Sequence, residues 1–297
     1  MISWIEVTIK IPSEIAEAVS SFLFELGSSG VVTEDTISDE KENGIYHLKG
    51  YFLDNDKFSS IFYKISSYLN SLREIGFNTG PNRVTIEKIK NEDLSENWKQ
   101  HFKTMEIGKN LVIKPPWEVY ENRGEKICIQ INPARAFGTG GHPTTRLCLI
   151  LLEEACAREK EISSMLDVGC GSGILAITGK KLNVEKVVGV DNDPIAVEES
   201  YKNIKQNDLE NKIEFFEAKL EDINGRFSLI VANIFSGPIC RMMPVFKEKL
   251  FPNGKLITSG IMNDQEGTVL GFAEENGFTL EKRMREDNWS AFLFTIR

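Results

Sequence analysis

The sequence predicts an α/β protein in which a mostly parallel sheet, covered by helices on both faces, follows a smaller α+β domain. Two observations carry this prediction. From residue 143 onward, helical patterns alternate with apolar strand patterns, which is typical of a parallel sheet between two layers of helices. Before residue 91, the order is strand, helix, strand, strand, helix, strand, which is typical of a ferredoxin-like domain. A chain of 297 residues is long enough for both domains.

The first domain is expected to span residues 1–90. Strands are predicted over 4–11, 30–34, 46–53 and 84–89, and helices over 13–26 and 58–75. The first strand alternates apolar and polar residues, and each helix carries its apolar residues on one face. This part of the sequence has no glycine-rich anion loop and no cluster of catalytic side chains, so we interpret it as a recognition domain.

A polar stretch over 91–102 carries Leu94, Trp98 and Phe102 four residues apart, which predicts a short amphipathic linker helix. The second domain then spans residues 103–297. Its strands are expected over 111–116, 126–131, 165–168, 186–191, 213–220, 227–233, 255–258, 279–285 and 289–296, and its helices over 143–159, from 174 onward, 195–209, 238–250 and 265–276. Because a short turn separates the last two strands, we expect an antiparallel C-terminal hairpin in the sheet.

Three glycines at alternate positions, Gly169, Gly171 and Gly173, follow the apolar run that contains Asp167. Glycine permits a sharp turn and lets a ligand approach where a Cβ would block it, and the next helix offers free N–H groups. Asp191 ends the following strand, 22 residues after Gly169 and near the ~20 expected for a ribose-binding carboxylate. We predict a nucleoside-type cofactor here, the alternative being an ordinary tight turn.

The spacing of the glycines separates two cofactor classes. A dinucleotide fingerprint has the pattern Gly-x-Gly-x-x-Gly, whereas the third glycine here comes one residue early. The spacing resembles the cofactor loop of class I S-adenosylmethionine methyltransferases, which have a Rossmann-like sheet. The resemblance implies that Asp167 and the three glycines bind S-adenosylmethionine and that the product is S-adenosylhomocysteine.

A second glycine-rich loop precedes the helix predicted from residue 143. Phe137, Gly138 and Thr139 in this loop, together with Thr145, are candidates to contact the amino-acid end of the cofactor through hydroxyl and N–H groups. The alternative is a flexible loop with a threonine cap. His142 is a candidate proton relay, although a histidine in such a loop is more often structural.

Asn233 ends the strand predicted over 227–233, at the edge of the sheet where ligands bind in open α/β folds. Its carboxamide oxygen can accept a hydrogen bond from an amine that is about to be methylated. The sequence Asn233-Ile-Phe-Ser236 resembles the Asn-Pro-Pro-Tyr motif of amino-group methyltransferases. Ser236 replaces its aromatic residue, which favours an aliphatic amine as the acceptor. The alternative is that Asn233 caps the next helix.

Composition and charge reduce the number of function classes that the sequence allows. The formal net charge of −9 disfavours a nucleic-acid-binding surface, no apolar run reaches the ~18 residues of a membrane span, and no signal peptide is visible. The five cysteines have no C-x-x-C spacing, so we expect reduced thiols in a cytoplasmic protein and no metal site. Residues 1–95 hold nine Lys and Arg against fifteen Asp and Glu, which suits a basic protein partner or, alternatively, a solvated acidic surface.

Three motifs together resemble one family, the ribosomal protein L11 methyltransferases (PrmA). They are Ala-Phe-Gly-Thr-Gly-Gly-His-Pro-Thr-Thr over 136–145, Asp-Val-Gly-Cys-Gly-Ser-Gly-Ile-Leu-Ala-Ile over 167–177 and Val-Ala-Asn-Ile-Phe-Ser-Gly-Pro over 231–238. Residues 98–102 and 259–261 also fit, so the resemblance covers nearly the whole chain. The sequence departs from the family at Phe235-Ser236, where Leu-Ala is usual, and at Ser290-Ala-Phe; these departures bear on substrate fit.

The resemblance implies a protein-lysine N-methyltransferase. It implies transfer of methyl groups from S-adenosylmethionine to lysine ε-amines and to the N-terminal α-amine of the large-subunit ribosomal protein L11. It also implies that Thr145, Gly169, Asp191 and Asn233 contact the cofactor. We expect ribosomal protein L11 as the partner, no direct binding to nucleic acid or membrane, and a monomer.

Three alternatives stay open at this point. The protein could methylate a different protein or a small amine, which candidate substrates would distinguish. It could be an NAD-dependent oxidoreductase, which the early third glycine disfavours. It could be an adaptor that binds a ribosomal protein without catalysis, which the cofactor loop and Asn233 disfavour.

Overall fold

The computed structural model of the chain describes residues 4–28, 30–35, 45–53, 58–80, 83–89, 102–121, 124, 126–132, 140–158 and 162–296. The chain divides into two compact units: an N-terminal unit, Met1–Lys103, and a C-terminal unit, Thr104–Arg297. The linker helix predicted over 91–102 lies outside the described residues, except for Phe102.

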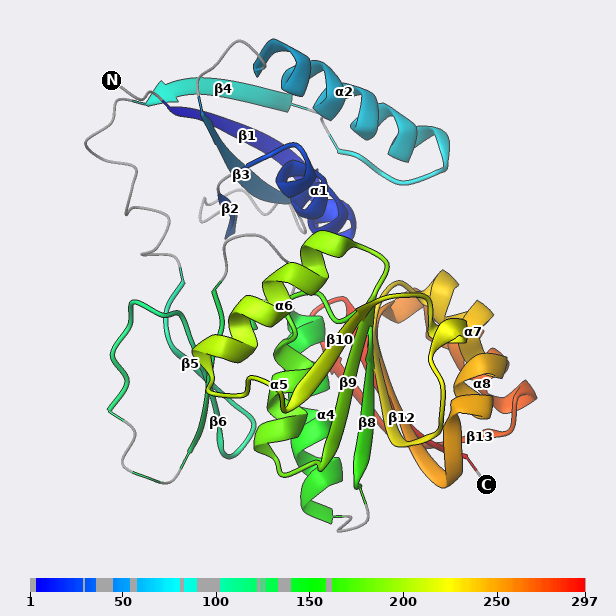
Figure 1. The fold of residues 1–297 in the computed structure, drawn as a ribbon. Helices are drawn as coiled ribbons and strands as arrows, with labels where there is room; N and C mark the ends of the chain where they lie inside the picture. The colour runs from blue at the N-terminus through cyan, green and yellow to red at the C-terminus, as the bar shows by residue number, and fades with distance from the viewer. Residues whose placement is uncertain are drawn as a thin grey trace. The chain divides into compact units, whose positions relative to one another are not determined.

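The described residues of the N-terminal unit form a four-stranded antiparallel sheet with two helices (Figure 1). Its elements, in the order expected from the sequence, are β1 (Trp4–Pro12), α1 (Ser13–Glu25), β2 (Gly30–Asp35), β3 (Ile45–Leu53), α2 (Phe58–Glu74) and β4 (Arg83–Ile89). The strands lie in the order β2-β3-β1-β4, and each neighbouring pair is antiparallel.

The core of this unit follows from the two periodicities in its sequence. Alternate residues of β1 point to the same face of the sheet. They and the apolar stripes of α1 and α2 form one buried cluster, which includes Ile5, Val7, Ile9, Ile11, Val19, Leu23, Ile65 and Leu69. The helices therefore cover one face of the sheet.

The C-terminal unit is built on a seven-stranded sheet with the order β10-β9-β8-β11-β12-β14-β13. The strands from β10 to β12 are parallel, whereas β14 is antiparallel to β12 and to β13, with which it forms a hairpin. The elements are α4 (Pro143–Arg158), β8 (Ser164–Val168), α5 (Ile174–Lys181), β9 (Lys186–Asp191), α6 (Pro194–Gln206), β10 (Ile213–Glu217), β11 (Phe227–Asn233), α7 (Ser236–Lys249), β12 (Leu250–Met262), α8 (Glu266–Glu275), β13 (Phe278–Glu286) and β14 (Trp289–Ile296).

Helices cover both faces of this sheet, with α4, α5 and α6 on one side and α7 and α8 on the other (Figure 1). The central strand β11 shows the consequence. Leu229 and Val231 belong to the first core, Ile230 and Ala232 belong to the second, and all four are fully buried. Burial on both faces explains why this strand is a continuous apolar run in the sequence.

A second, three-stranded sheet precedes α4, with the order β5-β6-β7. It consists of β5 (Met105–Ile107), β6 (Leu111–Lys114) and β7 (Ile127–Gln130). The sequence pattern predicted β6 and β7 but not β5, because three residues are too few to show an alternation. Glu153 of α4 anchors the turn between β5 and β6 by accepting hydrogen bonds from the Lys109 and Asn110 N–H groups, at 2.8 and 2.7 Å.

Two predicted boundaries are wrong. The strand expected over 213–220 ends at Glu217, and Leu220 is buried instead in a 3-10 turn, Leu220–Asp222. The strand expected over 255–258 belongs to the longer β12, which already begins at Leu250: Leu250 pairs with Phe227 and Lys255 pairs with Leu229, so the intervening residues bulge. Asn253 absorbs the bulge with a φ of 61°.

The five cysteines are free thiols, and Cys148, Cys170 and Cys240 are buried. Within the described ranges, no helix combines the length and apolar character needed to cross a membrane.

Candidate functional site

The sheet of the C-terminal unit has one point where the strand order reverses. From β8, the chain runs to β9 and β10 on one side and returns to β11 and β12 on the other. Ligands of open α/β sheets bind outside the carboxyl ends of the strands at such a point. The glycine loop follows β8, and Asp191 and Asn233 end β9 and β11, so the fold brings these predicted site residues to one edge.

The three glycines of the loop all have positive φ values: 71° at Gly169, 53° at Gly171 and 76° at Gly173. L-residues with a side chain rarely adopt this conformation. The Gly169 and Cys170 N–H groups both donate to the Val190 carbonyl, at 2.9 and 3.0 Å, which ties the loop to the end of β9. A Cβ on Gly169 would lie 2.6 Å from Ile234 Cγ2, so packing also requires glycine there.

Asp191 holds the other side of the loop. Its Oδ2 accepts from the Gly171 N–H and its Oδ1 from the Asp193 N–H, both at 3.0 Å. Burial raises the pKa of this carboxyl, while the backbone N–H bonds oppose that rise. Each carboxylate oxygen has a second lone pair, so Asp191 can still accept from a ribose diol.

Asp167 is the fully buried acid that precedes the glycine loop. Its Oδ2 accepts from the Ala176 N–H of α5 at 3.1 Å, whereas its Oδ1 is buried without a hydrogen-bond partner. Burial raises the pKa of this carboxyl to about 7. Leaving a buried acceptor unpaired costs about 1–3 kcal/mol. A ligand donor, above all an ammonium group, would remove that cost.

Asn233 and Thr145 meet across the site although they are 88 residues apart. The Asn233 Nδ2 donates to Thr145 Oγ1 at 3.3 Å. Thr145 is buried in the first turn of α4, and Asn233 is half-buried. This contact fixes the carboxamide plane and leaves its oxygen on the opposite edge, as a hydrogen-bond acceptor at the end of β11.

His142 lies just before α4. Its Nδ1 is 2.8 Å from Thr144 Oγ1, and its ring packs edge-on against Trp289 with the centroids 5.2 Å apart. Burial lowers the pKa of this imidazole to about 4, with a smaller contribution from the nearby Arg146 guanidinium. The ring is therefore neutral at pH 7 and is a weak base.

The residue after Asn233 explains a further glycine motif of the sequence, Ser259-Gly260-Ile261. Gly260 has a φ of 82°, and a Cβ there would lie 2.3 Å from the Ile234 carbonyl oxygen. Ile234 is thus held between Gly169 and Gly260. Ser236 Oγ donates to Gln265 Oε1 at 2.7 Å, which secures the far end of the same turn.

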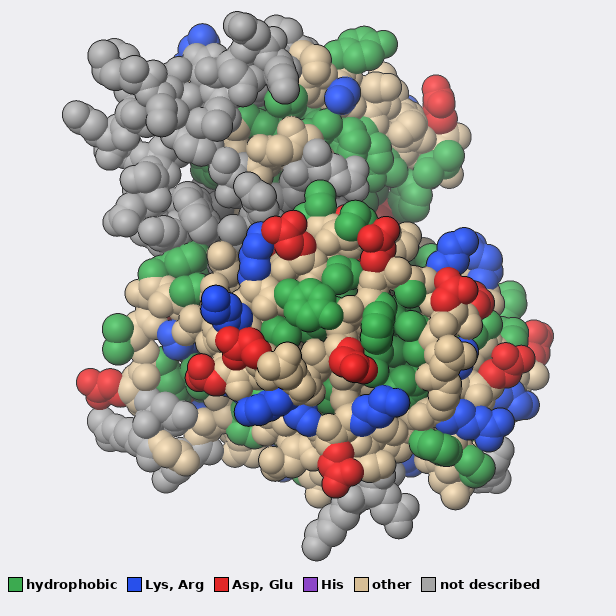
Figure 2. Space-filling view, viewed as in Figure 1, with side chains coloured by type: hydrophobic (Ala, Val, Ile, Leu, Met, Phe, Trp, Pro, Cys, Tyr) green, Lys and Arg blue, Asp and Glu red, His purple; other side chains and the backbone are tan. Residues whose placement is uncertain are grey.

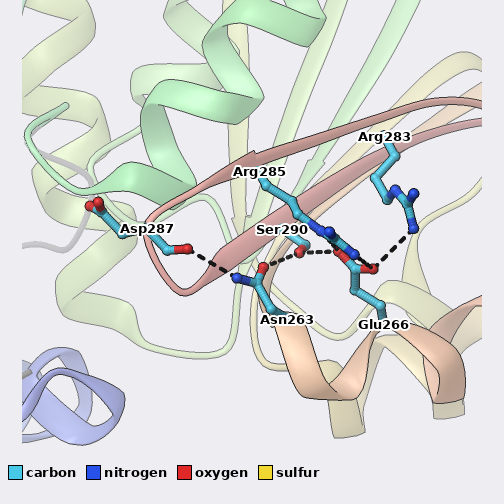
Figure 3. A network of polar contacts seen from close by, with 6 residues as sticks. All are labelled: Asn263, Glu266, Arg283, Arg285, Asp287 and Ser290. Atoms are coloured by element: carbon cyan, nitrogen blue, oxygen red, sulfur yellow. Dashed lines mark hydrogen bonds and ion pairs between the residues drawn. The ribbon is translucent and has the colours of Figure 1, made fainter.

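A polar network that the sequence did not predict fixes the hairpin β13–β14 to the start of α8 (Figure 3). Glu266 accepts from Arg285 Nε at 2.6 Å and from Arg283 at 3.2 Å, and the Arg285 hydrogen bond lowers the pKa of Glu266 to about 2. Ser290 Oγ lies 2.6 Å from Asn263 Oδ1 and also contacts Glu266.

The network gives a structural role to Ser290, one of the departures from the family pattern, and it steadies the hairpin that carries Trp289. Its hydrogen bonds join side chains 17 to 27 residues apart in the chain, so no local pattern signals them.

Phe137, Gly138 and Thr139 lie outside the described residues. Every other predicted site residue, including Gly171, Gly173 and His142, lies at or beside the carboxyl edge of the sheet.

Comparison with known proteins decides the family. A family model described as "Ribosomal protein L11 methyltransferase (PrmA)" matches residues 3–297. The chain belongs to this family. Relatives named ribosomal protein L11 methyltransferase, from Clostridium perfringens strains SM101 and 13, are each 33% identical over 313 residues, covering 99% of this chain and 99% of the relative. A solved structure of ribosomal protein L11 methylase from Lactobacillus delbrueckii subsp. bulgaricus is 29% identical with a TM-score of 0.62 and covers 66% of this chain and 100% of that one.

Membership of the family makes the chain an S-adenosylmethionine-dependent methyltransferase. The residues present fit that cofactor. Asp191 offers acceptors for the ribose hydroxyls, and the unpaired Asp167 Oδ1 offers one for an ammonium group. The positive φ values of the glycine loop let a ligand approach its backbone closely.

Proposed function

We propose that this enzyme transfers methyl groups from S-adenosylmethionine to lysine ε-amines and to the N-terminal α-amine of ribosomal protein L11. The observation that carries the proposal is the Thr145–Asn233 contact, because it presents a carboxamide oxygen beside the cofactor loop. The names of the relatives support the choice of protein substrate. Ser236, in place of an aromatic residue, supports an aliphatic amine as the acceptor.

The amine must be neutral to attack. A free lysine has a pKa of about 10.4, so deprotonating it at pH 7 costs about 4.6 kcal/mol. The cofactor supplies an activated methyl group on a positively charged sulfonium, and that charge lowers the pKa of a nearby ammonium. Asn233 accepts a hydrogen bond from the amine and turns its lone pair toward the methyl group. Alignment of this kind supplies much of the rate in two-reactant reactions.

We assign His142 to the support of this arrangement. Its pKa of about 4 and its contacts with Thr144 and Trp289 favour a neutral structural imidazole at the start of α4. A role as proton relay stays a prediction. Phe137, Gly138 and Thr139 stay predicted contacts to the amino-acid end of the cofactor.

For the domains, we propose that residues 1–90 form a ferredoxin-like recognition domain, joined by a linker helix over 91–102 to a methyltransferase domain over 103–297. The excess of acidic residues in the first domain suits a basic protein partner. On the face of the C-terminal unit seen in Figure 2, positive and negative side chains are interspersed. Among its described residues, this face therefore has no continuous basic patch of the kind that binds a nucleic-acid backbone. We also propose that the enzyme acts as a cytoplasmic monomer.

The proposal is tested by mass spectrometry of purified ribosomal protein L11 after incubation with this enzyme and S-adenosylmethionine. We expect methyl groups on lysine side chains and on the N-terminus, and far fewer after the same incubation time with the Asn233→Ala variant. A second basic ribosomal protein serves as the specificity control. Equal methylation of both proteins, or none of L11, would contradict the proposal.

A further inference from the structure

We propose that Ser200 and Asn203, two buried polar residues of α6, are positioning residues that set the shape of the cofactor loop and so the affinity for S-adenosylmethionine. The proposal concerns the cofactor alone, so it does not depend on which protein accepts the methyl group. Neither residue belongs to the glycine motif, and neither was predicted from the sequence.

Both side chains hold carbonyl groups of the loop. Ser200 Oγ donates to the Gly171 carbonyl at 2.8 Å, and Asn203 Nδ2 donates to the Ser172 carbonyl at 2.9 Å. Ser200 and Asn203 are fully buried. They lie three residues apart on α6, so both face the loop. Helix α6 therefore holds two successive peptide groups of the loop by hydrogen bonds from one side.

These two hydrogen bonds determine where the N–H groups of the loop point. In a trans peptide the C=O and the next N–H point in opposite directions, so the Ser172 N–H faces away from Ser200. The Gly171 N–H already binds Asp191, and the Gly173 N–H binds the Cys170 carbonyl at 2.8 Å. The loop is thus fixed by Asp191 on one side and by α6 on the other. Such a restraint matters most in a glycine loop, because glycine has the widest conformational freedom.

Asn203 also connects the loop to a second segment. Its Oδ1 accepts from the Asn132 N–H, just after β7, at 3.0 Å. One carboxamide therefore uses its donor on Ser172 and its acceptor on Asn132. The requirement for both functions distinguishes asparagine from aspartate at this position.

The same helix provides a matched control. Asn207 lies one turn further along and is also buried. Its carboxamide accepts from the Gln130 N–H at 2.9 Å and donates to the Gln130 carbonyl at 2.6 Å. It has the chemistry and burial of Asn203, and its bonds go to β7 and to its own helix rather than to the glycine loop.

The experiment measures the Kd for S-adenosylmethionine by calorimetry and the Tm without cofactor for Ser200→Ala, Asn203→Ala, Asn203→Asp and Asn207→Ala. We expect each of the first two variants to raise the Kd about tenfold, since each loses one buried hydrogen bond that shapes the loop. Asn203→Asp should raise it at least as much, because a carboxylate oxygen would face the Ser172 carbonyl. Asn207→Ala should lower the Tm and leave the Kd within about twofold.

Measuring KM and kcat separately on the full-length enzyme distinguishes an effect on the cofactor loop from a general loss of folded enzyme. We expect the Ser200 and Asn203 variants to raise the KM for the cofactor and to keep near-wild-type kcat at saturating cofactor. A wild-type Kd for Asn203→Asp would overturn the proposal. An equal rise for Asn207→Ala at a matched loss of Tm would do the same, because destabilisation alone would then explain the effect.

Discussion

The two units of the chain bury different kinds of side chain. Among the residues that the structure describes, the N-terminal unit buries two polar side chains, Ser28 and Thr79. Both are paired within their own unit, since Ser28 exchanges hydrogen bonds with the backbone of Tyr51 and Thr79 accepts from Arg73. The C-terminal unit buries many more, among them Thr144, Thr145, Glu153, Asp167, Ser172, Glu199, Ser200, Asn203, Asn207, Ser259, Glu266 and Ser290.

This difference marks where the chemistry lies. Burying a polar group is unfavourable unless it is paired, so a fold that only needs to pack does best with an apolar core. The N-terminal unit follows that rule. In the C-terminal unit, pairs such as Thr145–Asn233 and Asn203–Ser172 join segments distant in the chain at the carboxyl edge of the sheet. Variants of these buried groups distinguish an action on cofactor and acceptor from an action on folding alone.

The largest effect is expected from Asn233→Ala. The variant loses the oxygen that we propose orients the amine, so the single-turnover rate with ribosomal protein L11 should fall by about a hundredfold or more. Binding of the protein substrate should change far less. Rapid-quench measurement with enzyme in excess tests this, with Ser236→Ala as a neighbouring control. A wild-type rate would reduce Asn233 to a residue that steadies the start of α7.

A smaller but clear effect is expected from Asp191→Ala. The variant removes the charged acceptor that we propose for the ribose diol, worth about 1.5–3 kcal/mol, so the Kd for S-adenosylmethionine should rise tenfold or more. It also frees the Gly171 N–H, which disturbs the loop. Calorimetry measures the Kd, and Asp191→Asn, which keeps an acceptor, should lie between the two. An unchanged Kd would remove Asp191 from the site.

The smallest effect is expected from Asp167→Asn, as a pH-dependent change in Tm. Burial raises its pKa in the folded protein from 3.8 to about 7. An acid whose pKa is higher in the folded protein stabilises the fold fully below its unfolded pKa of 3.8. This contribution is lost as the pH rises through the folded pKa of about 7. The side chain introduced by Asp167→Asn stays neutral at every pH. The Tm of the variant without cofactor, relative to that of the wild type, should therefore be higher at pH 8 than at pH 5.5. The two proteins are compared by calorimetry at both pH values, and a constant difference would rule out this titration.

Periodic patterns predicted most of the fold because they reflect burial. The alternation in β1 and the continuous apolar run of β11 indicate one buried face and two buried faces, respectively. The glycine spacing predicted the tight turn after β8 because positive φ values leave few other residue types possible. Asp191 and Asn233 became candidates because each ends a recognisable strand, and the structure places them at the ends of β9 and β11.

The remaining parts carry no local signal. Ser200 and Asn203 face the loop from a helix whose sequence is ordinary and amphipathic, and Glu266 meets Arg285 only through the pairing of β14 with its neighbours. The unpaired oxygen of Asp167 is likewise visible only in three dimensions. Such contacts depend on strand order, which the sequence pattern alone does not specify.

Charge steering offers a route to test recognition in the full-length enzyme. Residues 1–95 carry a balance of −6, from nine basic and fifteen acidic residues. If this excess attracts a basic substrate, raising the ionic strength should lower kcat/KM on ribosomal protein L11 while leaving the Kd for the cofactor nearly unchanged.

The most direct test of the division between the units compares the full-length enzyme with a truncated protein that begins at Thr104. Both should bind S-adenosylmethionine with similar Kd values, because every proposed cofactor residue that the structure describes lies in the C-terminal unit. The truncated protein should show a much lower kcat/KM on intact ribosomal protein L11, since the surface that raises the local concentration of the acceptor amine is gone. Equal kcat/KM values for the two proteins would contradict the assignment of recognition to the N-terminal unit.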